Sequence, residues 1–173
     1  MDNPDRQNAF TLRRLGSDDA EAYRPLRLRG LKESPEAFGA SWADEAGKPL
    51  AWFAERLQNN LVIGGGLEGA LHGVAGLHSP GGKRAHKAML WGAYVLPQAR
   101  GRGLATALLR RLIGDARGAY EEIILSVVTS NEAALKLYVA AGFVQYGLER
   151  RALRVGDQSY DEALMALSLR EGG

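Results

Sequence analysis

The stretch PQARGRGLA at positions 97–105 decides what kind of fold we expect this chain to have. It is basic and rich in glycine, it follows an apolar segment, and it ends where Leu104, Leu108 and Leu112 recur every four residues. That spacing predicts a helix with one apolar face. A helix that begins on glycine and alanine presents free backbone N–H groups at its positive end, where a phosphate binds readily. The stretch therefore predicts a strand, a phosphate-binding loop and a helix in succession.

Other phosphate-binding loops fit the stretch less well. A dinucleotide-binding loop has the pattern G-x-G-x-x-G, which Gly101 and Gly103 begin, but its sixth position here is Thr106. The Walker A pattern G-x-x-x-x-G-K-[ST] is absent from the sequence. The non-functional alternative is a helix whose first turn carries small residues only for packing.

The composition is typical of one globular domain and excludes several kinds of site. We expect a single domain over residues 1–173, with its core over about 10–170. The sequence contains no cysteine, which excludes disulfides, cysteine nucleophiles and thiolate metal sites, and we expect no bound metal. The formal net charge of +2 does not favour nucleic-acid binding.

The sequence carries no pattern typical of a membrane protein. Residues 1–10 are polar and lack the apolar centre of a signal peptide. No apolar run approaches the roughly 20 residues that a membrane-spanning helix needs. We therefore expect a cytoplasmic protein that does not bind membranes.

The hydrophobic pattern predicts a mixed order of strands and helices. Strands are expected over residues 10–15, 61–66, 70–77, 85–95, 122–128, 144–154 and 160–169, and helices over 18–31, 49–58, 103–116 and 131–141. Asp18 with Glu21, and Thr129 with Glu132, have capping-box spacing, and Pro25 predicts a kink or a late start in the first helix. The order predicts an α/β (α+β) fold, with a mostly antiparallel sheet of six to seven strands flanked by about four helices. The helix between the fourth and fifth strands predicts a parallel crossover there.

A second polar motif follows the apolar strand at 122–128. Asn131 lies in the first turn of the next helix, and Tyr138 lies seven residues later, about 10 Å along the axis and on nearly the same face. We expect the helix to stop at Gly142, which Phe143 follows. An amide and a phenol thus line one side of a groove, although Tyr138 also fits an aromatic residue at the edge of the core with its hydroxyl in water.

Together the two motifs resemble those of the GNAT superfamily of N-acetyltransferases. The family's acetyl-CoA motif is Arg/Gln-x-x-Gly-x-Gly/Ala after the fourth strand, and its second motif is an Asn, a Tyr seven residues later and a final Gly-Phe. The matching residues are Arg100, Gly103 and Ala105 in the first motif, and Asn131, Tyr138, Gly142 and Phe143 in the second. The order of elements also matches over about residues 10–170, and the resemblance implies that the parallel fourth and fifth strands splay apart.

The resemblance implies that acetyl-CoA is the co-substrate and assigns it a binding site. The loop would hold the pyrophosphate through its backbone, with Asn131 in the same site. The loop residues concerned are Arg100, Gly101, Arg102, Gly103, Leu104, Ala105 and Thr106. A backbone N–H at Tyr94 or Val95 would polarise the thioester carbonyl. Tyr138 would be the general acid for the departing thiolate, because a phenol pKa of about 10 lies close to a thiol pKa of about 8.5.

The amine acceptor and a general base are less well defined by the sequence. Similar enzymes select the acceptor largely with the first two helices and the last hairpin, which indicates Glu36, Phe38 and Trp42 as substrate residues. Phe38 and Trp42 fit a core-facing pair equally well, and Glu36 also fits an exposed helix start. Five residues are candidate bases by type alone, with a chain of water molecules as the alternative: Glu33, Glu36, His72, His78 and Glu162.

The leading hypothesis is an acetyl-CoA-dependent N-acetyltransferase in which a primary amine attacks the thioester directly. The acceptor would be a small molecule or a peptide amine, and neither nucleic acid nor membrane is expected as a partner. A homodimer is an open expectation, since related enzymes are often dimers. The alternatives are a transferase for another acyl-CoA, a non-catalytic CoA-binding sensor of the same fold, and a dinucleotide-dependent enzyme.

Overall fold

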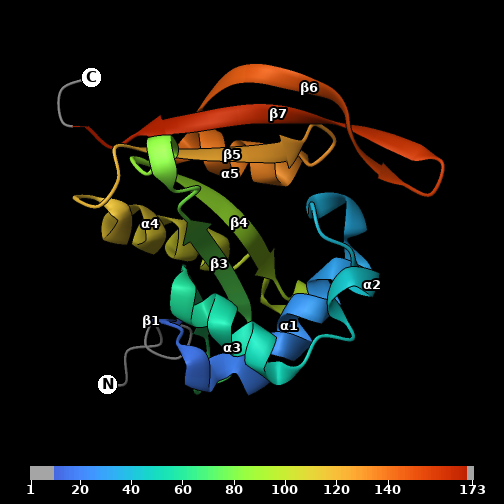
Figure 1. The fold of residues 1–173 in the computed structure, drawn as a ribbon, viewed down its shortest axis with the longest axis vertical. Helices are drawn as coiled ribbons and strands as arrows, with labels where there is room; N and C mark the ends of the chain where they lie inside the picture. The colour runs from blue at the N-terminus through green and yellow to red at the C-terminus, as the bar shows by residue number, and fades with distance from the viewer. Residues whose placement is uncertain (1–9, 171–173) are drawn as a thin grey trace, which may run out of the picture.

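The described part of the chain forms a mixed sheet of seven strands, whose spatial order is β1-β2-β3-β4-β5-β7-β6 (Figure 1). The computed structural model describes residues 10–170, so most of the segment at 1–10 that the sequence predicts not to be a signal peptide lies outside the described residues. The strands are β1 (Thr11–Arg14), β2 (Leu61–Gly66), β3 (Gly73–His78), β4 (Lys87–Val95), β5 (Glu122–Val128), β6 (Val144–Val155) and β7 (Gln158–Ser168). The long hairpin of β6 and β7 reaches beyond the end of β5 (Figure 1).

Five α-helices flank this sheet within residues 10–170. They are α1 (Ala20–Glu33), α2 (Trp42–Glu45), α3 (Leu50–Asn59), α4 (Leu104–Ala116) and α5 (Glu132–Ala140). The predicted fold class is confirmed, since every sheet contact except that between β4 and β5 is antiparallel. The one-turn helix α2 is absent from the prediction, because four residues are too few to show a helical period.

Two apolar cores lie on opposite faces of the sheet. Val62 belongs to the core with α1 and α3, and its neighbour Ile63 belongs to the core with α4 and α5. Successive strand residues point to opposite faces, so the two helix pairs cover opposite sides. The recurring leucines of α4 face the second core, as predicted, and each is at most 1% exposed: Leu104, Leu108 and Leu112. Burying each of these leucine side chains stabilises the folded state by about 1.5–3 kcal/mol relative to leaving it exposed.

Strands β4 and β5 diverge after a short parallel contact. Their register covers only Lys87–Met89 against Glu122–Ile124, although β4 continues to Val95 and β5 to Val128. The register of β4 with β3 also shifts between Val74 and Gly76, opposite Gly92, whose φ is +65°. A bulge of this kind bends a strand and increases its twist. The expected splayed pair is therefore present, and it opens a gap in the middle of the sheet.

Both predicted capping boxes are wrong, because other hydrogen bonds occupy the chain at these positions. The backbone N–H of Thr129 donates to Asp161 O at 2.9 Å, so the chain is still bound to β7 at this point and α5 begins later. Asn131 is the residue that caps α5, through its Oδ1, which accepts from the N–H of Ala134 at 3.1 Å. Before α1, the carboxylate of Asp19 accepts a hydrogen bond from the N–H of Gly16 across a 3-10 turn. Helix α1 therefore starts at Ala20, two residues after the predicted Asp18, and Pro25 lies inside it.

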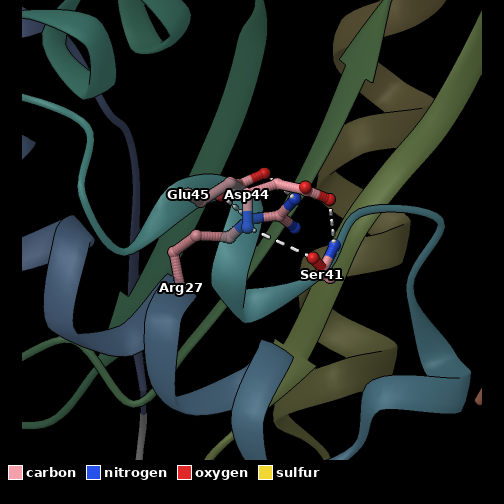
Figure 2. A network of polar contacts seen from close by, with 4 residues as sticks. All are labelled: Arg27, Ser41, Asp44 and Glu45. Carbon is pink, nitrogen blue, oxygen red and sulfur yellow. Dashed lines mark hydrogen bonds and ion pairs between the residues drawn. The ribbon is translucent and has the colours of Figure 1, made fainter. Parts of the chain in front are cut away.

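A buried ion pair fastens α2 to α1 (Figure 2). Arg27 is 5% exposed and Glu45 3% exposed, and the Arg27 guanidinium donates from Nε and Nη2 to the two carboxylate oxygens at 2.9 and 2.8 Å. Ser41 and Asp44 close the N-terminus of α2 by exchanging hydrogen bonds between side chain and backbone. A bidentate pair of this geometry satisfies both buried charges at once.

Replacing Glu45 with glutamine is expected to lower the free energy of unfolding by about 3–5 kcal/mol, because Arg27 would keep its charge without a counter-ion. Urea unfolding of the two proteins measures the difference. The control is Asp115→Asn, which breaks the exposed pair with Arg111 and is expected to cost less than about 1 kcal/mol. Equal losses in the two variants would contradict a special role for the buried pair.

Candidate active site

Two cavities meet at the gap between β4 and β5. One, of about 650 Å³, is lined by residues 100–106 other than Arg102, and we call it the loop cavity. The other, of about 550 Å³, is lined by Leu153 and Glu162 of the β6–β7 hairpin, and we call it the hairpin cavity. Ala93, Asn131 and Tyr138 line both cavities. The two spaces therefore join beside these three residues.

The glycine-rich stretch forms the loop that precedes α4 and borders the loop cavity. Gly101 and Gly103 have φ values of +72° and +83°, which place both in the left-handed region that glycine adopts readily. A Cβ atom built on either would meet no heavy atom within 4 Å, so the backbone is open on that side. The first N–H groups of α4 have no acceptor within the helix. The side chain of Leu104 is buried in the core, so any contact it makes with a ligand is through its backbone.

Arg102 is the one residue of this predicted set that lines neither cavity. Its guanidinium lies over the ring of Phe10, 5.3 Å from the ring centroid. Arg100, by contrast, lines the loop cavity, and its Nε donates to the carbonyl oxygen of Val95 at 3.0 Å. The structure thus places the two basic side chains of the loop in different surroundings.

The C-terminal end of β4 presents one backbone N–H to the gap. The N–H of Leu96 donates to His72 O at 2.8 Å, and backbone groups alternate along an antiparallel strand. The N–H of Val95 is therefore directed away from β3, on the side where its carbonyl meets Arg100. The amide of Tyr94 is directed toward β3, whereas its side chain lines the loop cavity and donates from its hydroxyl to Glu33 at 2.7 Å.

Helix α5 brings Asn131 and Tyr138 to the junction of the cavities. The Oδ1 of Asn131 is used by its cap, which leaves the amide nitrogen free to face a ligand. Tyr138 is 8% exposed and packs edge to face on Phe143, with the ring centroids 5.7 Å apart. Burial raises the pKa of the Tyr138 phenol to about 12. The phenol is therefore a weaker acid than its sequence position alone suggests.

The three predicted substrate residues do not gather at one place. Glu36 lines the loop cavity, and Phe38 lines both cavities with its ring centroid 6.4 Å from that of Tyr94. Trp42 is 45% exposed, lines neither cavity, and has the ammonium of Lys32 5.8 Å from its ring centroid. Phe38 and Trp42 therefore form neither a common wall nor a core-facing pair.

The candidate bases separate into two groups. Glu33 accepts from Tyr94 and Arg29, and these hydrogen bonds, that from Tyr94 first, lower its pKa. The Nδ1 of His72 accepts from the N–H of Leu67 at 3.2 Å and so helps to hold a turn. His78 and Glu162, by contrast, line the hairpin cavity.

Burial shifts the pKa of His78 and that of Glu162 in the directions that favour the neutral form of each side chain. It lowers the pKa of His78, and the charge of Arg56 lowers it further. It raises the pKa of Glu162, which a hydrogen bond with Ser126 opposes and the nearby Glu149 carboxylate reinforces. Glu162 therefore binds a proton more tightly than an exposed carboxylate does.

Several residues of the hairpin cavity were missed by the sequence analysis. Arg27, Arg56, Trp91 and Ser126 come from four different elements and have no common spacing. The one available signal was local, since Trp52 and Arg56 are four residues apart on a helix and stack with 4.5 Å between guanidinium carbon and ring centroid. Only the tertiary structure brings the other residues together.

The described residues hold no cluster of three or more metal-ligating side chains of the His, Cys, Asp and Glu types. None of the helices between residues 10 and 170 is long and apolar enough to span a membrane.

Comparison with known proteins identifies the family. Residues 28–143 match the model of the Acetyltransferase (GNAT) family. The N-alpha-acetyltransferase RimI of Mycobacterium tuberculosis is 36% identical over 113 residues, which cover 65% of this chain and 70% of that protein. The chain is similar in fold to a GNAT-family acetyltransferase from Streptococcus pneumoniae, with a TM-score of 0.83 and 22% identity over 94% of this chain and all of that one.

It is also similar in fold to the yncA protein of Salmonella typhimurium, whose structure contains acetyl-CoA, with a TM-score of 0.79 and 21% identity over 95% of this chain and 96% of that one. The match of the family model includes the loop before α4 and strands β2 to β5. The chain therefore belongs to the GNAT family of acetyltransferases.

Proposed function

We propose that this chain moves the acetyl group of acetyl-CoA to a primary amine, with Tyr138 as general acid and the Val95 N–H as donor to the acetyl oxygen. As a GNAT N-acetyltransferase the chain uses acetyl-CoA as its co-substrate. The relative from M. tuberculosis is an N-alpha-acetyltransferase, which supports an α-amine as the acceptor. The observation that carries the proposal is the junction of two cavities beside Tyr138.

The loop cavity fits the pyrophosphate end of the co-substrate. Gly101 and Gly103 keep side chains out of the space beside the loop, where a Cβ would meet no protein atom within 4 Å. The N–H groups at the start of α4 and the guanidinium of Arg100 supply donors and positive charge at that end. These features support a backbone cradle for phosphate rather than a packed helix start.

Bound acetyl-CoA supplies an activated acetyl thioester. During transfer a nitrogen–carbon bond forms, the carbon–sulfur bond breaks, the amine loses one proton and the sulfur gains one. Tyr138 lines both cavities, which supports its hydroxyl as the donor of that second proton. With a pKa of about 12, the phenol acts first as a hydrogen-bond donor to the sulfur and transfers its proton as charge develops there.

A thiol-release assay with purified protein tests this function. Acetyl-CoA with a panel of amines, amino acids and peptides is expected to release CoA at a rate well above that without acceptor. Propionyl-CoA and longer acyl-CoA molecules test the transferase alternative. Tight acetyl-CoA binding without release of thiol for any amine would favour the non-catalytic sensor.

Replacing Gly103 with valine is expected to abolish acetyl-CoA binding while the chain stays folded, because the side chain would occupy the space beside the loop. Calorimetric titration with acetyl-CoA measures the affinity. The matched control is Gly118→Val, since Gly118 has nearly the same φ of +84°, equally open surroundings and no place in either cavity. Similar affinities for acetyl-CoA in both variants would refute the assignment of the loop.

Replacing Tyr138 with phenylalanine is expected to lower kcat about 100-fold, the lower end for general acid–base catalysis, with little change in acetyl-CoA affinity. Steady-state kinetics and calorimetry measure the two quantities. Tyr23→Phe removes a hydroxyl from another buried tyrosine, which lines neither cavity, and is the control. Wild-type turnover in Tyr138→Phe would exclude the role.

The raised pKa of Tyr138 predicts the alkaline side of the pH profile. A general acid loses its function as pH rises through its pKa, and this pKa lies at about 12. We therefore expect kcat to rise as the acceptor amine loses its proton and then to stay level up to pH about 10. A fall in kcat below pH 10 that disappears in Tyr138→Phe would contradict the pKa shift.

A further inference from the structure

The charged side chains of the hairpin cavity are sorted by sign. The cations Arg27 of α1 and Arg56 of α3 line the cavity from the side of the N-terminal helices, with the imidazole of His78 of β3 on the same side. Glu162 of β7 is the carboxylate among the residues that line it. A cavity arranged in this way favours a ligand that carries both signs of charge.

Arg56 is a cation held in place by aromatic rings. Its guanidinium carbon lies 4.5 Å from the ring centroid of Trp52 and 4.7 Å from that of Trp91, so the two rings fix its orientation. No carboxylate of residues 10–170 forms an ion pair with it. A guanidinium stacked in this way keeps its edge N–H donors for an anion, which it binds with two parallel hydrogen bonds.

Arg27 adds a donor on the same side. Its Nε and Nη2 are used by Glu45, but Nη1 is directed to the bulge of β4, where a Cβ on Gly92 would lie 3.4 Å from it. Gly92 itself lines the hairpin cavity. Burial and then the charge of Arg56 lower the pKa of His78, which favours a neutral imidazole that donates one hydrogen bond.

Glu162 lies at the other end of the hairpin cavity from His78, close to the junction with the loop cavity. It pairs across the sheet with Val128, which lines both cavities. His78 pairs with Met89, where β4 and β5 are still joined and the gap has not opened. Glu162 is therefore near the junction of the two cavities, whereas His78 lies at the end where the gap has not opened.

We propose that the acceptor is a free amino acid, whose carboxylate binds Arg56 with help from Arg27 and His78 and whose amino group binds Glu162 beside Tyr138. This inference rests on the proposed function and narrows its acceptor. Glu162 holds the ammonium and takes the proton that it must lose before the amine attacks. The second proton, which the nitrogen loses as the amide forms, restores the hydroxyl of Tyr138 after that hydroxyl has protonated the sulfur. A peptide N-terminus fits less well, because its first carboxylate is replaced by a neutral amide.

The wild-type protein tests the carboxylate requirement directly. Thiol release from acetyl-CoA is compared for L-amino acids, the corresponding L-amino-acid amides, and tripeptides that begin with the same residues. We expect kcat/KM for the preferred amino acid to exceed that for its amide about 10- to 100-fold, the value of one charge-assisted hydrogen-bonded contact. Equal use of acid and amide, or use of the tripeptides alone, would overturn the proposal.

Variants of Arg56 test whether this residue binds the carboxylate of the acceptor. Arg56→Met keeps an apolar stem between the two indoles and is expected to raise KM for the amino acid about 10- to 100-fold, and to raise KM for the amide much less. Arg56→Lys retains the charge and is expected to recover part of the loss. Arg110→Met, on the exposed side of α4 and outside both cavities, is the control.

Acetyl-CoA affinity, measured by calorimetry for each variant, separates the possible failures. An unchanged affinity together with equal KM values for Arg56→Met and wild type would overturn the role of Arg56. An Arg56→Met protein that loses activity equally on the amino acid and on its amide would also overturn it, because a residue that binds the carboxylate affects mainly the amino acid. Failure of every amine with the wild-type protein would instead refute the proposed function itself.

Discussion

The short parallel contact between β4 and β5 is the constraint on which the rest of the structure depends. The two strands pair with each other only at Lys87–Met89 and Glu122–Ile124 and then diverge, so the backbone groups that face the gap beyond that contact lack partners within the sheet. Buried backbone groups need hydrogen-bond partners. The arrangement persists because Arg100 satisfies Val95 O and because the gap opens into two cavities. The same divergence leaves the Val95 N–H available to a ligand.

The elements on the two sides of the gap have different tasks. On the side of α4 and α5, backbone groups predominate: the open glycine loop, the first turn of a helix and an asparagine cap. Such groups fit a phosphate and a pantetheine-like chain, which vary little from one acyl-CoA to another. On the side of α1 and α3, charged and aromatic side chains predominate, and side chains of this kind are suited to distinguish one ligand from another.

The buried pair of Arg27 and Glu45 links the fold to the hairpin cavity. The Arg27 guanidinium carbon lies 5.2 Å from the ring centroid of Phe38 and 5.5 Å from that of Trp91, and both aromatic residues line the hairpin cavity. Desolvating two charges is costly, and a pair of apolar side chains often stabilises a fold equally well. The pair instead fixes the segment between α1 and α2, which forms one wall of the cavity. Its geometry therefore matters more for the shape of the site than for net stability.

The sequence by itself determined the order of elements, the loop before α4 and the family, because each rests on local spacing. Each of these signals lies within one loop or one helix. They are the recurring leucines of α4, the loop glycines Gly101 and Gly103, and the seven-residue interval from Asn131 to Tyr138. It did not determine the helix caps, where the pairing of Thr129 with β7 overrides a local pattern. The hairpin cavity was decided only by the tertiary structure. Its charged residues lie on α1, α3, β3 and β7, and the packing of those elements over a splayed sheet, rather than any interval along the chain, sets which of them face one another.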